Sequence, residues 1–110
     1  MHIVGDVKDT HCVLVDDIVD SAGTLCNAAK ALHAAGAKSV SAYVAHGVLS
    51  GPAFERINDS VMDELVITDS IRPVDQVHES EKIRVVTVAP LLAEAMNRIA
   101  HETSVSSLFY

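Results

Sequence analysis

The sequence predicts an α/β domain whose mostly parallel sheet is covered by helices on both faces. Short apolar runs of strand length alternate with segments in which apolar residues recur every three or four positions, and these are the periods of buried strands and amphipathic helices. The first apolar run, Val13 to Val15, is followed at once by carboxylates. Ligands bind parallel sheets at the carboxyl ends of the strands, so we expect a functional site at this edge.

The strands are defined by runs of β-branched and other apolar residues. Before the first run, the chain has a turn composition around Gly5 and Asp6 and is expected to be an exposed lead-in. Strands are expected at residues 12–16, 39–45, 64–68 and 82–88.

Three helices are expected. The first ends at Gly36, and the second, a short one, runs from Pro52 to about Asn58 because proline suits a first helical turn. The third begins at Pro90, and the tail follows it from residue 103. Residues 72–81 are polar and expected to be irregular. The apolar side of the first helix is Leu25, Ala28, Ala29, Leu32 and Ala35, and that of the third, expected to be buried, is Leu91, Leu92, Ala95, Met96, Ile99 and Ala100.

Composition restricts the function classes. The chain has 110 residues, 49% of them hydrophobic and 21% charged, so a single domain with a packed core is expected. The formal net charge of -7 disfavours nucleic acid and anionic membranes as partners. No segment has the pattern of a signal peptide or membrane-spanning helix. Cys12 and Cys26 fit a reduced, cytoplasmic protein.

The connection between the first strand and the first helix has the composition of a phosphate site. Unpaired N–H groups at a helix start carry partial positive charge and can surround a phosphate when the loop side chains are small. Hydroxyls can add donors. The loop that enters the helix consists of Asp20, Ser21, Ala22, Gly23 and Thr24.

The carboxylates need a different role because they repel phosphate. Asp16 and Asp17 could accept hydrogen bonds from sugar hydroxyls or hold a hydrated divalent cation, so the whole pattern suits a sugar phosphate. The alternative is structural: Ser21 caps the helix, while Asp17 and Asp20 are solvated charges near its positive end. The six histidines have no metal-ligand spacing. His46, at a strand end, and Asp69 with Ser70, at another, could be site residues or turn residues.

The stretch VLVDDIVDSAGTL (13–25) resembles the phosphoribosyl-pyrophosphate loop of the type I phosphoribosyltransferase fold. The rest of the chain is similar to one family with that fold, ribose-phosphate pyrophosphokinase, also called phosphoribosyl-pyrophosphate synthetase. The matching segments are GDV (5–7), CNAA (26–29), AHGVLSG (45–51) and SVSSLF (104–109). The similarity covers about Ile3 to Phe109, nearly the whole chain.

The resemblance implies a phosphoribosyltransferase-like three-layer sandwich and a transferase of nucleotide biosynthesis. The family moves the diphosphate of ATP to ribose 5-phosphate with magnesium, giving phosphoribosyl pyrophosphate and AMP. At the positions that match the family loop, the resemblance implies that residues 20–24 hold the 5-phosphate. It also implies that Asp16, with Asp17 beside it, binds the ribose hydroxyls. The family often has Thr and Gly where this chain has Ser21 and Ala22. A regulatory nucleotide (ADP) or phosphate would bind at a subunit interface of the homo-oligomer, a hexamer in the family, through Ser104, Val105, Ser106, Ser107, Leu108 and Phe109.

Family members are much longer, and the resemblance implies that residues 1–110 are their carboxy-terminal domain. The adenine site, most magnesium ligands and the loop with the catalytic Lys and Arg would precede Met1. No catalytic or metal-binding residue is therefore assigned here, and the chain alone is expected to be inactive, because phosphoryl transfer needs cations to balance developing charge.

Three other functions stay open. The chain could be a noncatalytic regulatory or binding partner of the full-length synthetase. A signalling receiver domain would use Asp69 as phosphate acceptor, but it needs a Lys where Ala89 stands. A nucleobase phosphoribosyltransferase would share the loop, but the 104–109 ending argues against it.

Overall fold

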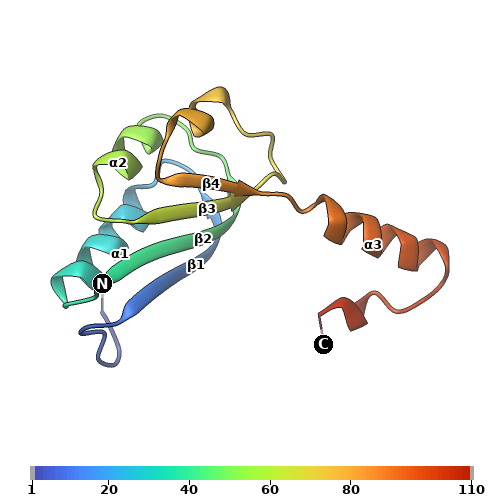
Figure 1. The fold of residues 1–110 in the computed structure, drawn as a ribbon, viewed down its shortest axis with the longest axis horizontal. Helices are drawn as coiled ribbons and strands as arrows, with labels where there is room; N and C mark the ends of the chain where they lie inside the picture. Colours follow the sequence, from blue (N-terminus) through green and yellow to red (C-terminus); the bar gives the residue numbers. More distant parts are fainter. Residues whose placement is uncertain (1, 110) are drawn as a thin grey trace.

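Four parallel strands form one sheet in the order β1-β2-β3-β4 in the computed structural model, which describes residues 2–109 (Figure 1). The α/β class and the parallel sheet predicted from the sequence are confirmed. Along the chain the elements are β1 (His11–Val19), α1 (Gly23–Ala34), β2 (Ser39–Gly47), α2 (Ala53–Asp59), β3 (Glu64–Thr68), the 3₁₀ turn η1 (Asp75–Glu79), β4 (Ile83–Val86), α3 (Ala89–Ala100) and the 3₁₀ turn η2 (Ser106–Leu108).

Three strands differ in length from the prediction: β1, β2, which was expected to end at Ala45 and continues to Gly47, and β4. β1 continues past Asp16 because β2 is equally long and the ladder goes on to Val19 opposite Gly47. β4 ends early, where the Asp69 carboxylate accepts the Val88 N–H at 2.9 Å and turns the chain into α3. The segment expected to be irregular contains η1, which Val77 anchors in the core.

The helical segments that connect the strands lie on one face of the sheet. Residues of α1, α2 and η1 belong to one buried cluster with residues of all four strands, and Figure 1 shows α1 and α2 on the same side of the sheet. The strand order follows the chain without reversal, and right-handed crossovers then place every connection on the same face. The described residues therefore build two of the three layers expected for the fold.

The other face of the sheet is open. Val13, Val15, Tyr43 and Val86 point out of it and are exposed, Val15 to 79%. We call these four residues the open sheet face. A shallow, mainly apolar groove of about 460 Å³ runs over it. Apolar surface of this kind is normally covered by another layer.

Helix α3 leaves the sheet and carries the tail with it (Figure 1). The prediction of a buried apolar side on α3 was wrong: none of its residues is buried, and Met96 is 69% exposed. The radius of gyration, 16.3 Å, exceeds the value of about 13 Å for a compact domain of this length. Periodicity revealed the apolar side of α3 but not what covers it. No helix of the described residues is long and apolar enough to cross a membrane.

Candidate functional site

The loop between β1 and α1, residues 20–24, has a strained backbone. Ala22 is the N-cap of α1 and adopts the left-handed conformation with φ 67° and ψ 9°, which costs a non-glycine residue about 1–3 kcal/mol. No side chain caps the helix, so the structural alternative in which Ser21 is the cap is wrong. The first turn also lacks acidic residues, although acids are stabilising there and the protein is acidic.

The start of α1 is a ready anion site. Within the described part of the chain, the N–H groups from Ser21 to Leu25 donate to no protein acceptor. They border a concavity of about 280 Å³. The lining residues are Asp16, Ile18, Val19, Asp20, Ser21, Ala22, Gly23, Thr24 and Leu25. The structure thus brings together every predicted substrate-binding residue except Asp17.

The two carboxylates that line the concavity, Asp16 and Asp20, have different surroundings. Asp16 lines the concavity, and its Oδ1 accepts the Asp17 N–H at 2.8 Å. The Asp20 carboxylate accepts a short hydrogen bond from the Ser50 hydroxyl. Asp16 is therefore the carboxylate best placed for a sugar hydroxyl, while Asp20 holds the loop to the β2–α2 connection.

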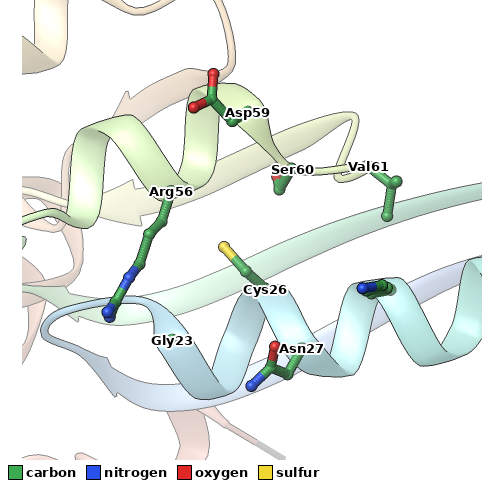
Figure 2. A pocket seen from close by; sticks show the side chains of 8 residues that line it. Gly23, Cys26, Asn27, Arg56, Asp59, Ser60 and Val61 are labelled. Carbon is green, nitrogen blue, oxygen red and sulfur yellow. The ribbon is translucent and has the colours of Figure 1, made fainter.

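The loop is supported from behind by Arg56 of α2 (Figure 2). Its Nη1 donates to the Ser21 carbonyl oxygen at 3.2 Å. A Cβ at Gly23 would lie 3.0 Å from the same nitrogen, so glycine leaves room for the guanidinium and not only for a ligand. Sequence analysis missed Arg56 and Ser50. The only signal for them is the proximity of the β1 and β2 ends expected in a parallel sheet.

A second cavity of about 470 Å³ lies on the Arg56 side of the loop, between α1 and α2. We call it the rear cavity; Arg56, Lys30, Cys26 and Ser60 are among its lining residues. Burial raises the pKa of the Cys26 thiol, against the opposing effect of its hydrogen bond with Ser60 and of the nearby cations. The thiol therefore stays neutral near pH 7 and acts as a packing group.

The described residues of the site do not form a cluster of metal ligands. In the described range, 2–109, no three His, Cys, Asp or Glu side chains come close enough to share a metal ion. Asp16 and Asp20 are already engaged by an N–H and a hydroxyl. A magnesium ion at this site would need further ligands from outside the described residues.

The chain matches a known protein family. The family model of the phosphoribosyl synthetase-associated domain matches residues 1–110, the full length of the chain. The chain belongs to this family.

Curated relatives of this phosphoribosyl synthetase-associated domain extend well beyond it. The ribose-phosphate pyrophosphokinase of Caulobacter vibrioides is 63% identical over 109 residues, which are 99% of this chain but 35% of that protein. The enzyme of the same name from Agrobacterium fabrum is 58% identical over the same share. The crystal structure of phosphoribosylpyrophosphate synthetase from Mycobacterium smegmatis matches 90% of this chain and 33% of its own, with a TM-score of 0.84 and 34% identity. The chain thus spans about a third of these proteins.

The tail of the phosphoribosyl synthetase-associated domain is held by Arg98. Its guanidinium donates to the Ser104 carbonyl oxygen at 3.1 Å and to the Ser107 hydroxyl at 2.5 Å, and its Nε pairs with Glu94. The predicted regulatory residues 104–109 therefore lie beyond the end of α3, apart from the sheet, and contain the short 3₁₀ turn η2 (Figure 1).

The other strand ends in this domain are tied by local hydrogen bonds. His46 Nδ1 lies 2.7 Å from the Ser70 hydroxyl, which donates to the Ala45 carbonyl oxygen at 3.1 Å. Hydrogen bonds from the Val88 N–H and the Thr87 hydroxyl lower the pKa of the Asp69 carboxyl. Asp69 thus holds the β4–α3 connection, and its geometry does not favour the receiver-domain alternative.

We expect Asp69→Asn to lower the urea midpoint at pH 7 but to matter less in acid. The depressed pKa of the folded carboxyl means that its stabilisation is present above the unfolded pKa, about 3.9, and disappears as the pH falls through the folded value. The difference in midpoint between the two proteins, followed by circular dichroism, should therefore shrink below that pH. A difference that is constant from pH 7 into acid would contradict the role of the charge.

Proposed function

We propose that this chain is the carboxy-terminal part of a ribose-phosphate pyrophosphokinase and binds ribose 5-phosphate at the 20–24 loop. One observation supports this most directly: the N–H groups at the uncapped start of α1 have no protein acceptor in the described chain and face a concavity that includes Asp16. Phosphate satisfies such donors, and a sugar hydroxyl satisfies the carboxylate. The names of the relatives supply the substrate class.

The residues of this chain would bind and orient the substrate. The loop amides would hold the 5-phosphate, assisted by the Ser21 and Thr24 hydroxyls, which are exposed at the loop. Asp16 would accept a hydrogen bond from the ribose ring. In the complete enzyme, ATP donates the diphosphate and magnesium supplies charge neutralisation. The ATP site, the catalytic cations and most magnesium ligands would come from outside this chain.

Two structural features support a role as part of a larger protein. The open sheet face lacks a covering layer within residues 2–109, and the apolar side of α3 has no partner there. The matched proteins are also about three times as long as this chain, because it spans 35% of them. We propose that the complete enzyme is a cytoplasmic homo-oligomer, in which residues 104–109 help to bind regulatory ADP or phosphate.

Calorimetric titration with ribose 5-phosphate, combined with an assay for AMP, tests the proposal. We expect the 110-residue chain to bind the sugar phosphate and to release no AMP when ATP and magnesium are added. Failure to bind would refute the site, and AMP release by the chain alone would refute its dependence on the missing part.

The alternative is a noncatalytic partner of a full-length synthetase. It is distinguished by mixing the chain with such an enzyme. A stable complex with altered turnover, detected by gel filtration and the same AMP assay, would favour the alternative.

A further inference from the structure

The 20–24 loop is fixed by residues 48–56, which comprise the β2–α2 connection and the first turn of α2. The Val19 carbonyl oxygen accepts the N–H groups of Val48 at 2.9 Å and Leu49 at 3.2 Å. The Asp20 carbonyl oxygen accepts the Ser50 N–H at 3.1 Å. Three residues of the 48–56 segment thus hold two consecutive carbonyl groups at the entrance of the loop.

The next carbonyl is held differently. The Ser21 oxygen accepts its hydrogen bond from the side chain of Arg56, at 3.2 Å from Nη1. The first two carbonyls are held by backbone N–H groups, which no substitution other than proline removes. The Arg56 contact is therefore the one carbonyl anchor of this series that a side-chain exchange can release.

These anchors determine the direction of the loop amides. In a trans peptide unit, the C=O and the following N–H point in opposite directions, and the described chain has no cis peptide. Carbonyls directed at the 48–56 segment therefore turn the N–H groups of Asp20, Ser21 and Ala22 away from it. For the Ala22 N–H, that orientation depends on Arg56.

We infer that Arg56 is a positioning residue of the 20–24 loop: it fixes the Ser21–Ala22 peptide so that the Ala22 N–H faces the anion-binding concavity. The peptide precedes the strained Ala22, with φ 67°, and it can rotate toward a relaxed conformation when its carbonyl is released. The ligand is the phosphate of ribose 5-phosphate, so this inference rests on the proposed function.

The charge of Arg56 adds to the effect. Among the described residues, Arg56 is within salt-bridge distance of no carboxylate, and Figure 2 shows Asp59, on the same helix, pointing away from it. An unneutralised cation behind the loop favours an anion in front of it. In a protein of net charge -7, this local contribution opposes the overall repulsion.

The test is Arg56→Met, measured in two ways. We expect the dissociation constant of ribose 5-phosphate to rise about tenfold in calorimetry, because the released Ala22 N–H no longer donates to the phosphate and this is the usual effect of losing one hydrogen bond to a charged group. In the ligand-free protein, the Ala22 amide signal in a ¹⁵N NMR spectrum should shift, while the melting temperature stays close to the wild-type value because Arg56 is exposed.

The matched control is Lys30→Met. Lys30 lines the same rear cavity and carries the same charge, but its side chain forms no hydrogen bond with the loop in the described chain. We expect it to change the dissociation constant about twofold or less and to leave the Ala22 signal in place. The positioning role is overturned if Arg56→Met leaves signal and affinity unchanged, or if Lys30→Met weakens binding equally.

Gly23→Ala provides an independent test, because its Cβ would lie 3.0 Å from Arg56 Nη1 and displace it. It should weaken binding in the wild-type background and add little in Arg56→Met. Additive losses would show that Gly23 acts without Arg56 and would overturn the inference. If the wild-type chain does not bind ribose 5-phosphate, the proposed function fails. The Ala22 amide signal alone then decides the positioning role. A shift of this signal in Arg56→Met supports the role, and an unchanged signal refutes it.

Discussion

Thr24→Asp is expected to abolish ribose 5-phosphate binding while leaving the fold at least as stable as the wild type. Thr24 is exposed in the first turn of α1 and lines the concavity. A carboxylate there faces the incoming phosphate, and the repulsion should weaken binding on the order of a hundredfold or more. The same charge interacts favourably with the helix dipole, which contributes about 0.3–1 kcal/mol. Calorimetry and thermal denaturation measure the two effects.

Two variants control this result. Thr24→Ser keeps the hydroxyl and should bind as the wild type does. Asn27→Asp adds the same charge about one turn further along α1, at the rear cavity, and should weaken binding far less. Binding by Thr24→Asp at wild-type affinity would show that the phosphate does not occupy the start of α1. A loss of binding together with a lower melting temperature would show that the variant acts through the fold.

The parts of the structure that depend on local sequence were predictable. β3 has the predicted bounds, 64–68, and α2 begins one residue after Pro52. The 20–24 loop was recognised because a buried strand, small residues and a helical period follow one another directly. Such patterns need no information from distant residues. Gly36 follows the end of α1 with φ 98°, a left-handed conformation that glycine adopts without strain. The helix stop was predictable for this reason.

Features that depend on distant residues were not predictable. The contacts of Ser50 with Asp20 and of Arg56 with Ser21 join positions 30 and 35 residues apart. The extra length of β1 depends on the length of β2. The exposed apolar side of α3 has the same periodicity as a buried one, so only the three-dimensional arrangement reveals that it lacks a partner within the described chain.

Leu65→Ala should destabilise the chain by about 2–5 kcal/mol, a large part of the 5–15 kcal/mol typical of a domain. Leu65 is fully buried at the centre of the sheet, between Ala42 of β2 and Ile83 of β4. Truncation removes apolar contacts and leaves a cavity that two parallel neighbours cannot close. Urea denaturation followed by circular dichroism measures the loss. A change below about 1 kcal/mol would contradict the assigned core.

Val15→Ala is the matched control, because it truncates an aliphatic side chain on the opposite, open sheet face, where Val15 is 79% exposed. If that face stays open in solution, the stability should change by less than about 0.5 kcal/mol. A loss comparable to that of Leu65→Ala would mean that the face is covered in solution. The midpoint would then depend on protein concentration if a second copy covers it, since association stabilises the folded state by mass action. The pair of variants therefore tests the core and the need for a further layer.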